Sequence, residues 1–202
     1  MSFRDDVPQP CKSEVDRYLD LWDSLPDYTD QEKALNKLFF GEFKSNDDIQ
    51  NILIKCSTLN DFYSTNIFKV YPVARHILSL DIDKSLYEGD ESLVEKIANL
   101  DIMNKEGIKT HHCFYSFASK YCSHHNPEAF PIYDSYVDKI LRHFRKKNKN
   151  FRFRNDDLKN YSSFKKVLFQ FQKLYGITEY SLKDLDRYLW QLGKEYYPND
   201  YS

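Results

Sequence analysis

The chain has 202 residues, of which 41% are hydrophobic and 16% aromatic, and its formal net charge is −2. This composition is typical of a globular protein and excludes a disordered tail. No apolar run approaches the roughly 18 residues that a membrane-spanning helix needs. The polar and acidic start, Met1–Asp6, does not have the pattern of a secretory signal, so we expect a cytoplasmic protein with no membrane partner.

Apolar residues recur with helical spacing along nearly the whole chain. In chain order, the first predicted helix begins at Ser13, and the second follows Asp30 and ends at Gly41. The third is capped by Asn46, and the fourth begins at Pro72. The first third of the chain is therefore predicted to be helical with short connections.

The same reasoning predicts five more helices. Their signals are Asp90 as a cap, a stripe from Phe114 that closes at Asn126-Pro127, a helix opened by Asp134, a helix that ends at Gly176, and a last helix opened by Ser181 with Asp184. Strand signals are few, and the alternation Phe151–Arg154 is either a small hairpin arm or a loop. The sequence predicts an all-α fold of about nine short helices. These form one compact domain over residues 1–202, or two lobes with a cleft between them.

Cysteine and histidine residues do not predict a bound metal. The four cysteines are far apart, so free thiols are expected in a reducing compartment. Histidines and cysteines cluster between His111 and His125, but a helix spreads these positions over about 16 Å, and no zinc-ligand spacing is met. We therefore expect no metal and no other cofactor.

Positive charge is concentrated in one segment. Residues 138–173 hold twelve Lys and Arg against three Asp, about +9, whereas residues 1–137 carry about −9. This asymmetry predicts a basic face suited to nucleic-acid phosphates, to an acidic protein partner, or to a solvated helix end. The candidate phosphate-binding residues are Lys139, Arg142, Arg145, Lys146, Lys147, Lys149, Arg152 and Arg154.

Asp134 stands at the start of the helix that leads into this basic segment. As an N-cap, its carboxylate accepts a bond from the first helical turn. Beside a basic surface, the same carboxylate is also suited to act as a general base or to stabilise positive charge on a sugar. The flanking Tyr133 and Tyr136 are candidates either for stacking on a substrate base or for packing in the core.

The segment Pro131–Leu141 resembles part of the helix-hairpin-helix (HhH-GPD-like) DNA glycosylase superfamily, in which an aspartate precedes a helix of the form Val-Asp-Thr-His-Val-x-Arg-Val. The resemblance implies that Asp134 supports attack at the anomeric carbon of a flipped nucleotide. The counterpart of the glycine-rich hairpin of the family is Gly107–Thr110, in a hairpin-like segment that continues into the following helix over residues 104–147. By the same resemblance, Lys109 is the candidate Schiff-base nucleophile.

These patterns lead to a hypothesis with alternatives. The first hypothesis is a nucleic-acid-binding protein, with DNA as the expected partner. It is either an N-glycosylase that cleaves the glycosidic bond of an extruded base or a non-catalytic relative. The second is a non-enzymatic interaction module whose basic face binds an acidic protein. A small-molecule enzyme with a pocket of tyrosines is a third.

Overall fold

The computed structural model of the chain describes residues 4, 6–104 and 106–198. Residues 1–3 and 5, part of the polar start on which the expected cytoplasmic location rests, lie outside these ranges. The described residues form ten α-helices, one π-helix, one 3-10 helix and a two-stranded sheet, which confirms a mostly α-helical fold. None of the helices in these ranges combines the length and the apolar character that a membrane crossing requires.

The helices and strands are α1 (Lys12–Asp23), α2 (Pro26–Asn36), the π-helix η1 (Lys37–Glu42), α3 (Ile49–Phe62), α4 (Val70–Ser79), α5 (Asp83–Glu88), α6 (Ser92–Ala98), β1 (Asn99–Met103), β2 (Lys109–Cys113), α7 (Tyr115–His125), α8 (Ser135–Lys147), the 3-10 helix η2 (Asn155–Leu158), α9 (Tyr161–Tyr175) and α10 (Leu182–Tyr196). The chain divides into two compact units. Unit 1 comprises Met1–Pro26 and Tyr133–Ser202, and unit 2 comprises Asp27–Ile132.

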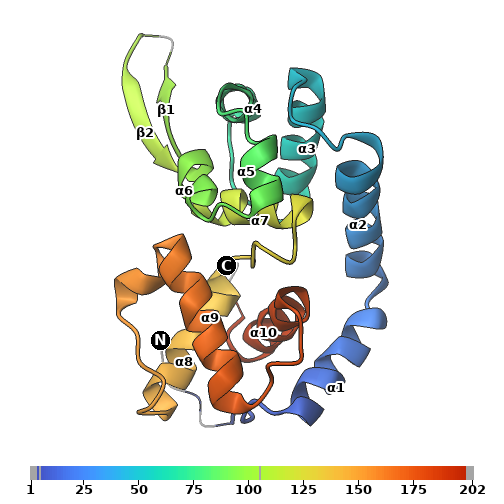
Figure 1. Cartoon of the computed structure of the whole chain (residues 1–202), viewed down its shortest axis with the longest axis vertical. Coiled ribbons are helices and arrows are strands. Elements are labelled where there is room, and N and C mark those ends of the chain that lie inside the picture. The colour runs from blue at the N-terminus through green and yellow to red at the C-terminus, as the bar shows by residue number, and fades with distance from the viewer. Residues whose placement is uncertain (1–3, 5, 105, 199–202) are drawn as a thin grey trace. The chain divides into compact units, whose positions relative to one another are not determined.

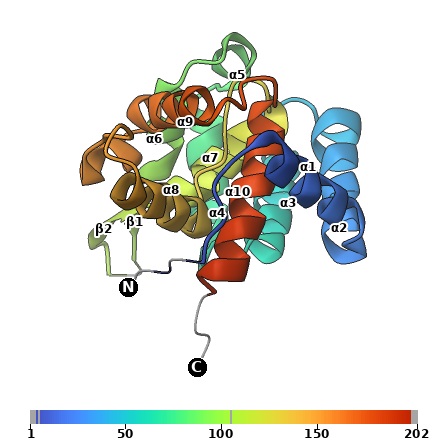
Figure 2. The ribbon, with the colours of Figure 1, turned by 90° about the horizontal axis from the view of Figure 1, so that it is seen from below.

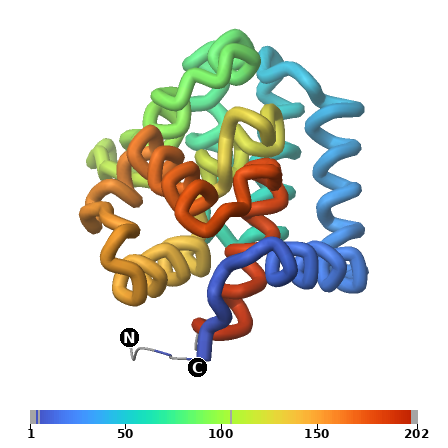
Figure 3. Tube along the Cα trace, turned by 60° about the horizontal axis from the view of Figure 1, so that its bottom comes forward, coloured from blue at the N-terminus to red at the C-terminus, as the bar shows by residue number. Residues whose placement is uncertain are grey.

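Unit 1 is organised around α10, which packs against both α8 and α1 (Figure 2). The first helix of the chain thus lies beside the last (Figure 3). The Gln191 side chain donates to the Tyr18 carbonyl at 2.8 Å, and the Tyr18 hydroxyl donates to Glu195 at 2.7 Å. The rings of Tyr18 and Tyr188 are buried together, 5.5 Å apart. Aromatic residues therefore supply much of this core, as the aromatic content of the sequence suggests.

Unit 2 packs α3 against α4 and α6 against α7. Directly after α6, β1 and β2 pair antiparallel, with Asn99 opposite Cys113 and Met103 opposite Lys109. This hairpin extends away from the helices of its unit (Figure 1). Both strands are largely exposed, so the hairpin depends on its turn and on its anchor, the buried Leu100.

Gly107–Thr110, matched by resemblance to the family's glycine-rich hairpin, form the turn and the start of the second strand of a β-hairpin, so they do not join two helices. The Asn104 side chain accepts from the backbone N–H groups of Glu106 and Ile108, both at 2.9 Å, and so folds the turn. Gly107 has φ 78°, which glycine adopts without strain. Short-range turn chemistry, rather than helical periodicity, determines the structure of this segment.

Several predicted helix boundaries also differ: α2 begins at Pro26 and not after Asp30, and α4 begins at Val70 and not at Pro72. Asn46 does not cap α3, because its side chain is buried; Asp48 is the N-cap and accepts from Gln50 N and Asn51 N. Gly41 does not end a regular helix, because α2 ends at Asn36 and the chain continues as the π-helix η1. The short helix α5 was not predicted.

The predicted ends of α7 and α9 and the predicted start of α10 are confirmed. Gly176 ends α9 with φ 64°, and Ser181 and Asp184 form a reciprocal capping box at α10. Asn126 ends α7. The alternation Phe151–Arg154 is a loop, which resolves the alternative left by the sequence.

Candidate nucleic-acid interface

The start of α8 is fixed by the side chain of Asp134. Its backbone is extended, with φ −139° and ψ 156°, and its carboxylate accepts from the Tyr136 N–H at 2.8 Å. An aspartate here satisfies a backbone donor that has no partner within the helix. The structure thus confirms Asp134 as the N-cap. The residue is half-buried, so it is not sealed within the core.

The two tyrosines beside Asp134 have different surroundings. The Tyr133 hydroxyl donates to Asp138 Oδ1 at 3.1 Å, and burial together with the charge of Asp138 raises the pKa of Tyr133. Tyr136 is buried, with its ring edge-on to Trp190 at 6.2 Å. Tyr133 is therefore partly accessible and held as a neutral phenol, whereas Tyr136 is a core side chain of the α8–α10 packing.

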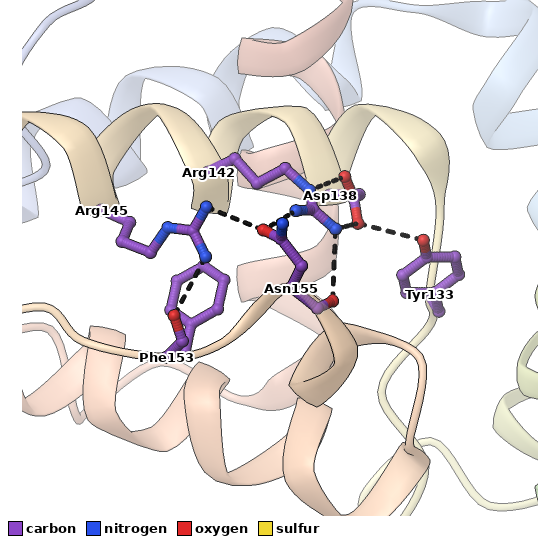
Figure 4. Close-up of polar contacts among 6 residues, drawn as sticks. All are labelled: Tyr133, Asp138, Arg142, Arg145, Phe153 and Asn155. Atoms are coloured by element: carbon purple, nitrogen blue, oxygen red, sulfur yellow. Dashed lines mark hydrogen bonds and ion pairs between the residues drawn. The ribbon is translucent and has the colours of Figure 1, made fainter.

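Arg142 connects α8 to Asn155, the first residue of η2 (Figure 4). Its Nε and Nη2 atoms bind the two carboxylate oxygens of Asp138, and its Nη1 donates to Asn155 Oδ1. The side chains of Arg142 and Asp138 are 25% and 18% exposed, so this ion pair is largely shielded from water. A two-pronged arginine–carboxylate contact fixes geometry more firmly than a single contact.

Arg145 makes the neighbouring contacts. It donates to the Phe153 carbonyl and to Asn155 Oδ1, both at 2.9 Å, and its guanidinium lies 4.7 Å from the centre of the Phe153 ring (Figure 4). Arg142 and Arg145 were both predicted to bind phosphates. In the structure both donate to Asn155 at the start of η2, and Arg145 also binds the preceding loop at the Phe153 carbonyl, so they hold this region against α8.

Four further cations of the basic segment have contacts within unit 1. The Lys139 ammonium donates to the Tyr197 carbonyl at 3.1 Å, and that of Lys147 to the Val7 carbonyl at 3.4 Å. The Arg152 Nε donates to the Lys149 carbonyl at 2.7 Å, and Arg154 forms an ion pair with Asp157. Of these four, Lys147, Arg152 and Arg154 remain exposed.

Lys146, Lys149 and Arg152 form the part of the basic segment that we call the basic end of α8. All three are exposed, and within the described ranges no carboxylate pairs with any of them. They stand at the C-terminal end of α8 and in the loop that follows, where the helix dipole favours cations. Their charges are therefore available to an external polyanion.

The aromatic residues interleaved with this segment mostly face inward. Phe151 is fully buried and packs on Phe171, with ring centres 5.6 Å apart. Phe153 is half-buried beneath Arg145. Phe151 thus anchors the loop to α9, while Arg152 and Arg154 of the same loop are exposed.

Lys109 does not belong to the unit that contains this site. It is an exposed residue of β2 in unit 2, and in the described part of the chain nothing is bonded to its side chain. Asp134 belongs to unit 1. Lys109 was matched to the family nucleophile through the hairpin-like segment 104–147, and the first part of that segment is a β-hairpin.

Sequence reasoning missed a buried polar network in unit 2. Lys55 is fully buried on α3, and its ammonium donates to Phe43 O at 3.1 Å, Ser45 O at 2.9 Å and Asn46 Oδ1 at 2.6 Å. Burial lowers the pKa of Lys55 to about 8. A lysine within an apolar helix stripe gives no sequence signal for such a role, because its acceptors lie in a separate loop.

The histidine and cysteine cluster is dispersed in the structure. His124 is buried and bonded to the Tyr63 hydroxyl at 2.9 Å, whereas His111 is an exposed strand residue paired with Asp101. Burial and the nearby Lys55 charge lower the pKa of His125 to about 3, so its imidazole is neutral. Across residues 4, 6–104 and 106–198, no group of three or more His, Cys, Asp or Glu side chains is arranged to hold a metal ion.

Comparison with known proteins identifies one family. A family model named HI_0787_N, described as an N-terminal domain, matches residues 14–129. A protein of Haemophilus influenzae (strain Rd), described only as uncharacterised, is 50% identical over 151 residues, which make up 74% of this chain and 70% of that protein. No solved structure matches the chain. The family match ends shortly before unit 2 does, and α8 follows it.

Proposed function

This chain belongs to the HI_0787_N family, and we propose that it binds nucleic acid, with DNA as the expected partner, through the basic end of α8. The observation that carries the proposal is that Lys146, Lys149 and Arg152 are exposed and have no carboxylate partner in the described ranges. Neutralising phosphates releases condensed counterions, which favours binding at exposed, unpaired cations. Arg142 and Arg145 support the site by holding the adjoining loop in place.

The binding experiment measures the fluorescence anisotropy of labelled duplex and single-stranded oligonucleotides at about 50 mM salt. The variant Lys146→Gln with Lys149→Gln removes two charges from the basic end of α8. The matched control, Lys37→Gln with Lys44→Gln, removes two exposed lysine charges from unit 2. We expect the first variant to bind about tenfold or more weakly and the control to bind like the parent chain.

Two results would contradict the binding proposal. One is the absence of any anisotropy change for either kind of oligonucleotide. The other is an equal loss of binding in the variant and its control, which would show that binding depends on net charge and not on the basic end of α8. Salt-sensitive self-association in size-exclusion chromatography without an oligonucleotide shift would instead favour the acidic protein partner.

The proposal extends to chemistry at Asp134. Its support is the resemblance to helix-hairpin-helix DNA glycosylases together with the position of the carboxylate, half-buried at the start of α8 and next to Tyr133. In this role the carboxylate stabilises positive charge that develops on the sugar as the base leaves. Lys109 and Tyr136 have no part in the proposal.

Asp134→Asn tests the chemistry, because asparagine caps a helix as well as aspartate does but carries no charge. Base release is measured as alkali-induced cleavage of end-labelled duplexes that carry uracil, hypoxanthine, 8-oxoguanine or 3-methyladenine. We expect a loss of about 100-fold or more in rate. Asp48→Asn, the same change at the N-cap of α3, should leave the rate unchanged. If the parent chain releases none of these bases, the chemical role is withdrawn and the binding proposal stands.

A cytoplasmic location belongs to the same proposal. It is supported by the four cysteines, all of which are free, two of them exposed. Exposed thiols persist in a reducing compartment.

A further inference from the structure

Unit 2 contains an open pocket of about 520 Å³ between α4 and the β-hairpin. From α4 it is lined by Arg75 and His76, and from the hairpin by Asn99, Asp101 and His111. α4 packs directly against β1, so both walls belong to one unit. The volume is in the range of pockets that hold small ligands, and most of the lining groups are polar.

Arg75 is the strongest anion-binding group of this pocket. It is exposed, and no side chain or carbonyl in the described ranges bonds to its guanidinium. A guanidinium presents several N–H donors in one plane and matches two oxygens of a phosphate. An unpaired arginine in the wall of a pocket therefore points to an anionic ligand.

The two histidines are oriented by their own partners. His76 Nε2 lies 2.8 Å from the Lys96 carbonyl, which only accepts, so this nitrogen carries a hydrogen. His111 Nδ1 lies 3.1 Å from Asp101 Oδ1, and a carboxylate beside an imidazole favours a hydrogen on the nitrogen that faces it. In each ring the second nitrogen is left for a ligand, as an acceptor when the ring is neutral and as a donor when it is charged.

An exposed aromatic side chain stands next to the arginine. Tyr71 and Arg75 are four residues apart on α4, and side chains with this spacing share a helix face. Tyr71 is 58% exposed, and Phe68, just before the helix, is 95% exposed. Aromatic rings that remain in water beside a cation are suited to stack on a nucleobase.

We propose that this pocket binds a nucleotide, with its phosphate on Arg75 inside the pocket and its base outside the lining residues, on Tyr71 of the same α4 face. The site is within the segment matched by the family model, whereas the basic end of α8 is outside it. The proposal is therefore independent of the α8 interface. The phosphate belongs either to a free mononucleotide or to the end of a nucleic-acid strand, and both present the same chemistry to Arg75.

Isothermal titration calorimetry of the full chain tests the pocket with adenosine 5′-monophosphate, adenosine and inorganic phosphate. We expect the nucleotide to bind at least tenfold more tightly than either fragment, because only the nucleotide reaches both groups. Arg75→Gln should weaken nucleotide binding at least tenfold. Tyr71→Ala should weaken the nucleotide but leave inorganic phosphate unchanged. Lys44→Gln, which removes one exposed charge of unit 2 outside the pocket, should have no effect.

To distinguish a free mononucleotide from a strand end, binding is measured with the Lys146→Gln/Lys149→Gln variant, so that binding at α8 does not contribute. If a 5′-phosphorylated single strand binds more tightly than both its 5′-hydroxyl form and the mononucleotide, the ligand is a strand end. If the mononucleotide binds as tightly as the strand, the ligand is a free nucleotide. The proposal is overturned if neither binds at millimolar concentration, or if Arg75→Gln binds the nucleotide like the parent. Circular dichroism verifies that the exposed substitutions leave the fold intact.

Discussion

Lys55 shows how one buried cation connects stability to pH. Its pKa is lowered to about 8 by burial in the folded chain, against about 10.4 for an unfolded lysine. Between these values the unfolded state binds more protons, so the free energy of unfolding contributed by this group rises with pH. We expect a rise of about 2 kcal/mol between pH 8 and pH 10, measured by urea unfolding.

Lys55→Met isolates this contribution. Burial raises the pKa of Cys56 to about 12, and this thiol opposes the rise, since its contribution to stability falls as pH increases above about 8.5. Cys56 is present in both chains, so its contribution cancels when the free energy of unfolding of the methionine variant is subtracted from that of the parent chain. If the difference in the free energy of unfolding stays constant between pH 8 and pH 10, Lys55 does not release its proton in that range.

Asp138 is expected to be the most important acceptor of the α8 network. Asp138→Ala removes the partner of Arg142 and of the Tyr133 hydroxyl, both half-buried. We expect the free energy of unfolding to fall by about 2 kcal/mol, measured with urea. The control is Asp30→Ala, whose ion pair with Lys33 is about three-quarters exposed and should cost less than about 0.5 kcal/mol. Equal effects would mean that the Arg142 contacts add no stability.

At the scale of the elements, the crossing of α8 and α10 depends on Gly193. A Cβ atom at this position would lie 2.6 Å from the Tyr136 Cβ and 2.8 Å from the Tyr136 carbonyl oxygen. The neighbour is backbone, so it cannot simply rotate away. We expect Gly193→Ala to lower the free energy of unfolding by about 2 kcal/mol, although alanine favours helix by about 1 kcal/mol.

Gly41→Ala is the control for this substitution, since its nearest neighbour is Lys37 Cγ at 3.9 Å. Because Gly41 lies within η1 and its Cβ would meet no clash, this substitution should not lower the free energy of unfolding and should raise it by up to about 1 kcal/mol. A Gly193→Ala variant as stable as the parent would show that the two helices can separate without cost.

The elements also show what sequence can predict. Capping signals at Asp134 and Ser181 depend on residues within one helical turn, and both are confirmed. Asn46 has the same local signal, but its side chain is bound by Asp83, 37 residues further along the chain, and by Lys55, nine residues further along on α3. The β-hairpin was missed because its strands are exposed, so they lack an apolar alternation.

At the scale of the whole molecule, the basic segment was predictable but its use was not. Counting charges identifies residues 138–173 as basic. It does not reveal that Arg142 and Arg145 are bonded within unit 1, because Asn155 and the Phe153 carbonyl reach them only after folding. Lys146, Lys149 and Arg152 remain as the candidate phosphate contacts. The pocket at Arg75 gave no sequence signal, since its walls come from separate segments.

These three cations set the expected salt dependence of nucleic-acid binding. Three phosphate contacts give a slope of log affinity against log salt of about −2.7 on duplex DNA, or a loss of roughly 40-fold between 50 and 200 mM salt. The Lys146→Gln/Lys149→Gln chain should lose only about fourfold over the same range. Anisotropy titrations at four salt concentrations give both slopes. Equal slopes would place the phosphate contacts elsewhere.

The hydrogen bond from Gln191 to Tyr18 joins residues 173 positions apart. On the ribosome, α1 therefore leaves the exit tunnel long before α10 has been made, and it has no permanent neighbour within its own unit during that interval. Residues 27–132 are continuous and complete their set of contacts first. Translation would thus yield a folded middle segment with an unpaired amino-terminal helix, a stage at which a chaperone or a protease has its best access to Val15 and Tyr18, buried in the finished protein.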